Sequence, residues 1–167
     1  MKNKKVKGFT LIELIVVIAI IAVLAAILIP NLMSWVGKSN LRTANTNAKA
    51  VATNSATILA ELETAGVYLS SAGSGIYTAA DLGFTGTFPE SMGSFKEAVA
   101  KAAGLPKGSK WGVEFNEQGE VLAAFWAKDG SSPYVGTYPN ETQKKNETKA
   151  DASALEFAKK APAETTK

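Results

Sequence analysis

One carboxylate lies inside the most apolar stretch of the chain. Glu13 follows a leader with lysines at 2, 4, 5 and 7, and residues 14–29 form an unbroken apolar run that ends at Pro30. A charged side chain inside a bilayer costs about 2.5–3.5 kcal/mol on insertion scales, so an intramembrane acid indicates a functional role and a partner. The alternative is that Glu13 lies near one end of the span and reaches the interface.

Other residue types that commonly do chemistry are sparse. The sequence has no histidine and no cysteine, and its acids at 81, 90, 117 and 129 are scattered. No nucleotide-binding loop, catalytic carboxylate pair, dense calcium loop or metal-ligand spacing stands out. We therefore expect no enzyme activity, no cofactor and no bound metal.

The net charge of +3 comes from the leader. Removing residues 1–8 takes away four lysines and leaves 14 basic against 15 acidic residues, a net charge of about −1. The basic pI of about 9.0 is therefore no sign of a nucleic-acid surface, and none is predicted. Four lysines before an apolar span, with no similar cluster just after it, predict a cytoplasmic N-terminus and an exported bulk.

The stretch KGFTLIELIVVIAIIAVLAAILIP resembles the class III signal and N-terminal helix of type IV pilins and the related pseudopilins. The resemblance implies a prepilin peptidase that cuts on the cytoplasmic side between Gly8 and Phe9 and methylates the new amine of Phe9. It maps the family's glutamate onto Glu13, which would attract the Phe9 amine of a neighbouring subunit. A low-dielectric helical bundle strengthens such a pair, and leaving either charge unpaired there is costly.

The same resemblance implies partners and a location. The partners are other copies in a helical homopolymer, the prepilin peptidase, and an assembly ATPase with its platform protein. The chain would be a single-pass membrane protein before assembly and part of an extracellular pilus afterwards. The absence of cysteine departs from the many pilins that close a C-terminal loop with a disulfide.

A single long helix is predicted for residues 10–64. Its first part, residues 9–29, would be about 31 Å long, which matches a bilayer core. Trp35 follows where an interfacial aromatic residue would lie, although packing against the domain is an equal alternative. Pro30 and Gly37 predict bending or melting between them, the region that family resemblance says loosens on assembly, and Gly66 should cap the end.

The second part of this helix is amphipathic. Asn45 and other polar residues fall outside its apolar stripe and are expected on the solvent sides. The stripe follows alternating steps of three and four residues and consists of Leu41, Ala44, Ala48, Val51, Ser55, Ile58 and Leu62.

The remaining elements predict an α+β fold with a small antiparallel sheet on the helical stripe, as in the pilin headgroup. Residues 66–93 are predicted to form a surface connection that contains a single helical turn at 78–82. Ser94 and Glu97 have capping-box spacing before a short helix that Gly104 and Pro106 end. Strands are predicted at 111–115, 121–126 and 134–138, with a turn at 116–119.

Four segments follow from this pattern. They are a cleaved leader (1–8), a hydrophobic transmembrane and polymerisation helix (9–36), a globular headgroup (37–139) and a polar C-terminal tail (140–167). The tail is expected to be partly disordered, with a short helix at 151–160. Glycosylation-type triplets begin at Asn140 and Asn146, and in a bacterial chain we interpret them as chance matches.

Four aromatic residues of the predicted strands have two interpretations. Packing is the simpler one, and stacking of exposed rings on a polysaccharide or host surface is the other. These residues are Trp111, Trp126, Tyr134 and Tyr138.

Three functions are compatible with the sequence. The leading hypothesis is a structural subunit of a type IV pilus used for adhesion, motility or related surface functions. The first alternative is a pseudopilin of a secretion or DNA-uptake machine, which shares the N-terminus. The second is a secreted or tethered binding protein with an ordinary signal peptide cut after Val23-Leu24-Ala25, which leaves Glu13 unexplained and discards part of the predicted helix.

Overall fold

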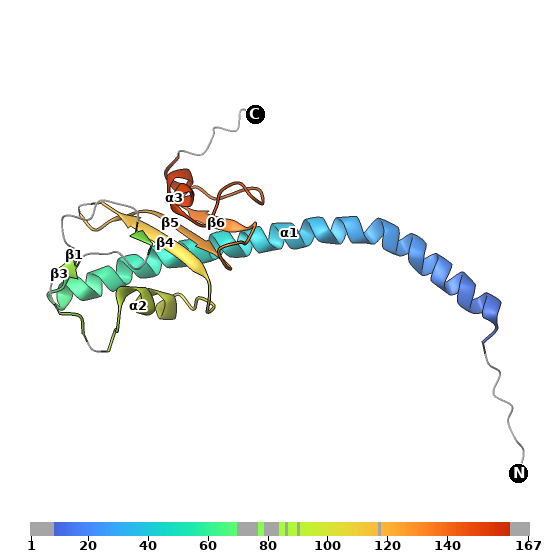
Figure 1. The fold of residues 1–167 in the computed structure, drawn as a ribbon, viewed down its shortest axis with the longest axis horizontal. Helices are drawn as coiled ribbons and strands as arrows, with labels where there is room; N and C mark the ends of the chain where they lie inside the picture. The colour runs from blue at the N-terminus through green and yellow to red at the C-terminus, as the bar shows by residue number, and fades with distance from the viewer. Residues whose placement is uncertain are drawn as a thin grey trace, which may run out of the picture. The chain divides into compact units, whose positions relative to one another are not determined.

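The computed structural model describes residues 9–69, 77–78, 84–85, 87–89, 91–116 and 118–160 of the chain. The chain divides into two compact units, and the boundary between them falls between Gly37 and Lys38. Helices and strands are labelled in chain order in Figure 1. The order is a long apolar helix, then a small antiparallel sheet with short helices, which is the predicted α+β, pilin-like arrangement.

Helix α1 spans Leu11–Thr64 and confirms the predicted long helix. It is helical through both Pro30 and Gly37, so the melting expected between these residues is absent from this structure. Its end is as predicted. Gly66 has a positive φ of 79°, and the Val67 and Gly66 amides donate to the carbonyls of Leu62 (2.8 Å) and Glu63 (3.0 Å). This is a Schellman cap, which satisfies the last carbonyls of the helix.

The predicted apolar stripe of the second part of α1 is buried in every member. It forms the main core with helix α2 (Phe95–Ala102) and one face of the sheet. One assignment on this helix was wrong: Asn45, expected on a solvent side, is only 6% exposed. The hydrogen bonds described below explain why a polar residue is tolerated there.

The main sheet has four strands in the order β2-β4-β5-β6, all antiparallel. Three of them, β4 (Lys110–Phe115), β5 (Val121–Ala127) and β6 (Val135–Tyr138), confirm the predicted strands. The fourth, β2 (Tyr77–Thr78), falls within the segment expected to be a surface connection. Most of the turn predicted at 78–82 lies outside the described residues, and Thr78 belongs to β2. Strands β1 (Tyr68–Leu69) and β3 (Phe84–Thr85) form a separate two-stranded sheet.

Helix α2 is held by the local signals that predicted it. Ser94 and Glu97 form the capping box, with the Ser94 hydroxyl accepting from the Glu97 amide at 3.2 Å. Phe95, the first residue of α2, meets Phe115 of β4 edge to face, with ring centroids 6.0 Å apart. This aromatic pair joins the short helix to the sheet.

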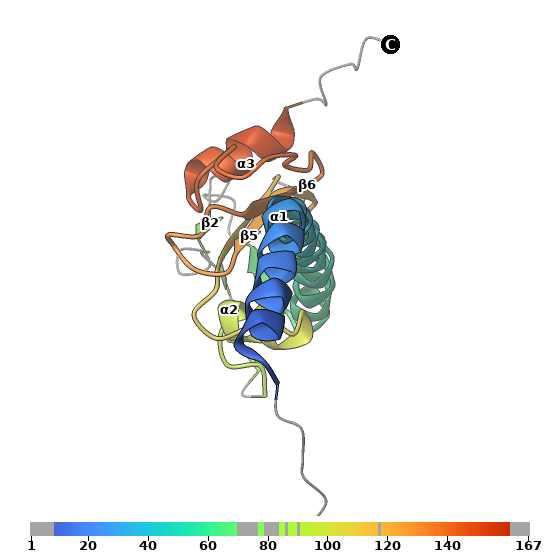
Figure 2. The same cartoon turned by 90° about the vertical axis from the view of Figure 1, so that its right-hand side faces the viewer.

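Both faces of the sheet are covered. Alternate strand residues such as Val113 and Ala124 face the core with α1 and α2, whereas Phe125 and Val135 pack in a second cluster with helix α3 (Ala152–Lys159). Figure 2 shows α3 on the opposite side of the sheet from α1. Because side chains alternate between the faces of a strand, burial on both sides explains why β4 and β5 are buried almost throughout.

Residues 140–160 are anchored by the buried Thr142 and by one face of helix α3 (Ala152–Lys159), which corrects the expectation of a partly disordered tail over this part of it. Helix α3 confirms the short helix predicted there, and its Leu155 is fully buried. The Lys159 ammonium lies 2.7 Å from Glu156 and 3.0 Å from the buried Glu114 of β4. Hydrogen bonds to Glu156 and then Glu114 raise the pKa of Lys159. Residues 161–167 lie outside the described residues.

Asn45 joins α1 to the C-terminal part of the chain. Its amide donates to the Thr142 carbonyl at 2.9 Å, and its Oδ1 accepts from the Thr137 amide at 3.1 Å and lies 3.0 Å from the Thr142 hydroxyl. Beside it, β6 approaches the helix so closely that a Cβ on Gly136 would overlap the backbone of Ala44 and Asn45. Only glycine permits this contact, and it places β6 within reach of the Asn45 side chain.

We predict that Asn45→Ala lowers the free energy of unfolding by about 2–4 kcal/mol, because it leaves buried groups of Thr137 and Thr142 without their partner. Guanidinium titration of the full chain in detergent, followed by tryptophan fluorescence, measures this change. Asn47→Ala, a half-buried asparagine two residues along the same helix, is the control and should change stability by less than about 0.5 kcal/mol. Equal stability of the two variants would contradict the role given to Asn45.

Candidate functional site

The first candidate site is the apolar surface of residues 9–36. Among the described residues, all the exposed large hydrophobic side chains except Tyr68 and Leu122 lie in this segment. Phe9 is the most exposed of them, at 92%. Helix α1 is also the one helix in the described part of the chain that is long and apolar enough to cross a membrane. A continuous apolar surface of this kind marks a contact with lipid or with another protein.

Glu13 has a local partner at the start of this segment. One of its carboxylate oxygens accepts hydrogen bonds from both the backbone amide and the hydroxyl of Thr10, each at 2.8 Å. The Thr10 hydroxyl in turn accepts from the Glu13 amide at 3.3 Å. This reciprocal pattern is a capping box, with Thr10 at the N-cap and Glu13 at the third helical position. The sequence carried this signal as a threonine three residues before a glutamate, and the sequence analysis missed it.

Pro30 and Asn31 lie within helix α1 in this segment, and neither interrupts it. Pro30 has no amide hydrogen to donate to the preceding turn, yet the helix continues past it. The neighbouring Asn31 donates its side-chain amide to the Ile27 carbonyl at 3.3 Å. Backbone bonding of this kind lets a polar side chain lie in an apolar helix without a partner from elsewhere.

The four aromatic residues proposed for glycan contact take different positions. Trp111 and Trp126 are paired across β4 and β5, and each is only 6% exposed in the main core. Tyr138 packs against the same core from β6 and is half-buried. Tyr134 is half-buried in the loop between β5 and β6. The structure brings two of the four, Trp126 and Tyr134, together at one pocket.

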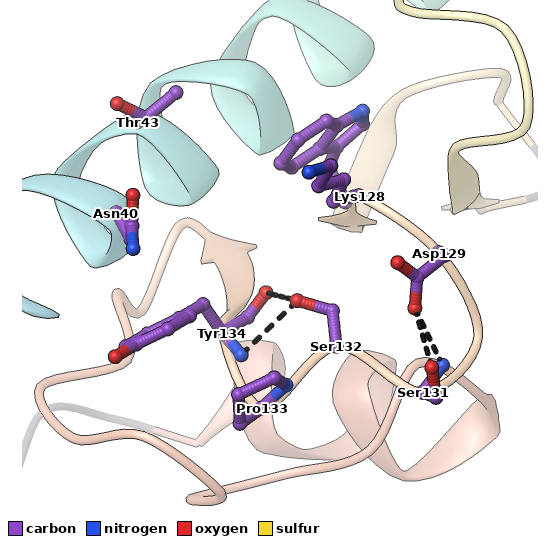
Figure 3. Close-up of a pocket in the computed structure, with 9 residues that line it drawn as sticks. Asn40, Thr43, Lys128, Asp129, Ser131, Ser132, Pro133 and Tyr134 are labelled. Carbon is purple, nitrogen blue, oxygen red and sulfur yellow. Dashed lines mark hydrogen bonds between the residues drawn. The ribbon is translucent and has the colours of Figure 1, made fainter.

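This pocket is the second candidate site and has a volume of about 400 Å³. Figure 3 shows Asn40 and Thr43 on α1 across from the β5–β6 loop. The whole pocket lies within the unit of residues 38–167. Its walls are Asn40, Thr43, Trp126, Lys128, Asp129, Ser131, Ser132, Pro133 and Tyr134.

The loop wall of the pocket is held by its own hydrogen bonds. Asp129 Oδ1 accepts from the Ser131 amide (2.9 Å) and hydroxyl (2.8 Å), and these two bonds lower the pKa of Asp129. The Ser132 hydroxyl donates to the Tyr134 carbonyl at 3.2 Å and accepts from its amide at 3.3 Å (Figure 3). The described residues contain no cluster of three or more histidine, cysteine, aspartate or glutamate side chains that could hold a metal ion.

Comparison with known proteins bears on the first site. Residues 3–29 match the family described as the prokaryotic N-terminal methylation motif. The type IV major pilin protein PilA of Myxococcus xanthus is 49% identical over 51 residues, which are 30% of this chain and 23% of that protein. The type IV wide pilus major component PilA4 of Thermus thermophilus is 62% identical over 37 residues, 22% of this chain and 28% of that protein. The chain thus spans about a quarter of each relative, and no solved structure matches it.

We predict that Thr10→Val frays the start of α1, because it removes the hydroxyl of the capping box. Loss of an N-cap costs about 0.5–2 kcal/mol, which corresponds to roughly 2- to 30-fold faster exchange of the first helical amides. Hydrogen exchange of the amides of residues 13 and 14, which donate to the hydroxyl and the carbonyl of Thr10, measures the effect in micelles. Thr57→Val, which removes an exposed hydroxyl bonded only to the Thr53 carbonyl of its own helix, should leave these amides unchanged. Unaltered exchange in Thr10→Val would rule out the cap.

Proposed function

We propose that this chain, whose residues 3–29 carry the N-terminal methylation motif, is a structural subunit that polymerises into a type IV pilus. The motif and the two type IV pilin relatives support membership of the type IV pilin family. The prepilin peptidase cuts between Gly8 and Phe9 and methylates the Phe9 amine. Residues 9–36 then span the membrane until assembly, when they pack with the same segment of other subunits in the core of an extracellular filament.

The observation that carries this proposal is the exposed apolar surface of residues 9–36. Its side chains, from Leu11 to Val36, are mostly half exposed or more, so burying them requires lipid or other protein. Burial of apolar area stabilises by about 25 cal/mol per Å². A bilayer provides that burial for one subunit, and a bundle of identical helices provides it in a filament.

Glu13 gives the bundle its register in this proposal. In the single subunit its carboxylate is bonded to Thr10, which satisfies two donors but supplies no opposite charge. In the bundle it attracts the Phe9 amine of the neighbouring subunit, and a charge pair is far stronger in a low-dielectric core than in water. An offset that separated the two charges would leave both unpaired, which is costly. Pro30 begins the part of α1, up to Gly37, that bends or melts when the subunits pack together.

Two alternative functions differ from that of a pilin in the filament they predict. A pseudopilin of a secretion or DNA-uptake machine shares this N-terminus but forms a short fibre, and filament abundance separates it from a pilin. Both matched relatives are major components of pili, which favours the pilus. A tethered or secreted binding protein would form no filament. The assembly ATPase and platform protein follow from the proposed pilus, as do the surface functions of adhesion and motility.

We predict that Glu13→Gln is processed normally yet yields at least tenfold fewer filaments, measured by shearing and immunoblotting of cells. Glutamine can still complete a capping box, so this variant separates the charge from the helix cap. Glu13→Val should also fail to assemble. Glu61→Gln, an exposed glutamate on the same helix, is the matched control and should assemble fully. Wild-type amounts of filament from Glu13→Gln would refute the pairing role.

A further inference from the structure

The pocket between α1 and the β5–β6 loop has no role in the assembly just proposed. Its polar lining groups include some that make no hydrogen bond within the described residues. The exposed side chains of Asn40 and Thr43 and the hydroxyl of the half-buried Tyr134 are of this kind. Because these groups are at least partly exposed and bond to no other part of the protein, their donors and acceptors are available to a ligand.

We infer that this pocket binds a neutral, polyhydroxylated ligand: one or two sugar residues of a glycan. The volume of about 400 Å³ falls at the lower end of small-ligand pockets, which are roughly 300–1,000 Å³. That space accommodates a sugar ring or a disaccharide. It is too small for an extended peptide or a folded partner.

The charges of the pocket favour a neutral ligand. Lys128 and Asp129 are its only ionisable lining groups apart from the Tyr134 phenol, and their charges cancel at neutral pH. Asp129 is held as an acceptor by Ser131, while Lys128 offers donors only. A phosphate or carboxylate site would be expected to present several cationic groups or convergent amides, and the described lining presents one cation beside an anion.

The remaining lining groups match the chemistry of a sugar. Each hydroxyl of a sugar both donates and accepts, and Asn40, Thr43 and Tyr134 supply both functions. The aromatic ring of Tyr134 offers an apolar face to the C–H groups of a pyranose, and aromatic side chains with a polar tip suit ligands of this mixed character. Figure 3 shows Asn40 projecting from α1 toward the loop that carries Tyr134.

The wall is also preorganised. The Asp129–Ser131 and Ser132–Tyr134 hydrogen bonds fix the loop, and the Asn146 amide donates to the Pro133 carbonyl at 2.7 Å, which ties the loop to the C-terminal segment. A loop ordered before binding loses less conformational entropy when the ligand arrives. Because the whole pocket lies within residues 38–167, binding does not depend on filament formation and goes beyond the proposed function.

The test uses the full chain in detergent with a panel of methyl glycosides of glucose, galactose, mannose and N-acetylglucosamine. Binding is measured at millimolar concentrations by saturation-transfer NMR and by the change in tryptophan fluorescence. The pocket variants are Tyr134→Phe and the double variant Asn40→Ala with Thr43→Ala. The matched control is Thr46→Ala with Asn47→Ala, on the same helix but outside the pocket, and circular dichroism verifies the fold of each variant.

We expect at least one glycoside to bind the wild type and the control equally. Each pocket variant should bind it about tenfold more weakly, as expected for the loss of one or two hydrogen bonds. Removal of a sugar hydroxyl should weaken binding to the wild type similarly, because a site built around that group leaves its own partners unpaired. Absence of binding to every glycoside, or equal binding by folded pocket variants, would overturn the inference.

Discussion

Helix α1 is longer than its own domain can cover. Fifty-four residues correspond to about 80 Å at the standard helical rise. From Leu41 onward one stripe of α1 is buried in the core of the second unit, whereas the apolar side chains of residues 9–36 are exposed. An apolar helix face of this extent is stable only where lipid or other helices take the place of water. Insertion into a membrane and self-assembly both remove the apolar surface of residues 9–36 from water.

Polar side chains within the apolar segment are few, and two of them are bonded within the segment itself. Glu13 is bonded to Thr10, and Asn31 to the Ile27 carbonyl. Local bonding of this kind lowers the cost of holding polar atoms in an apolar environment. For Glu13 it leaves the charge uncompensated, so the carboxylate remains available to a cation. The Glu13 carboxylate can therefore keep its hydrogen bonds to Thr10 in the single subunit and gain an opposite charge when another subunit brings one close.

The second unit is a stable platform of three layers. Its sheet is covered on one face by α1 and α2 and on the other by α3. Without a cystine, the C-terminal segment is held by Asn45 and by the ion pair of the exposed Lys159 with the buried Glu114. The Asn146 amide, which donates to the Pro133 carbonyl, ties the β5–β6 loop beside the pocket to the same segment. Hydrogen bonds between residues far apart in the sequence therefore hold the C-terminal segment in place, as a disulfide could.

Much of this fold could be predicted because its signals are local. The 3/4 spacing of Leu41 to Leu62, the capping box at Ser94 and the alternation in β4 each depend on a few neighbouring residues. What was missed depends on distant ones. Asn45 is buried because Thr137 and Thr142 reach it across more than ninety residues, and residues 152–159 form a packed helix because the second face of the sheet needs cover. The pocket likewise joins α1 to a loop far along the chain.

The N-terminal residue of the mature protein distinguishes a pilin from a protein with an ordinary signal peptide. Intact-mass and terminal-peptide mass spectrometry of protein isolated from its native host determines this residue. The expected mature chain begins at Phe9 with a methylated amine and retains the whole of α1. A mature chain that begins at Ala26, as after cleavage of an ordinary signal peptide, would contradict this expectation, because both Glu13 and the apolar surface of the helix would then be discarded.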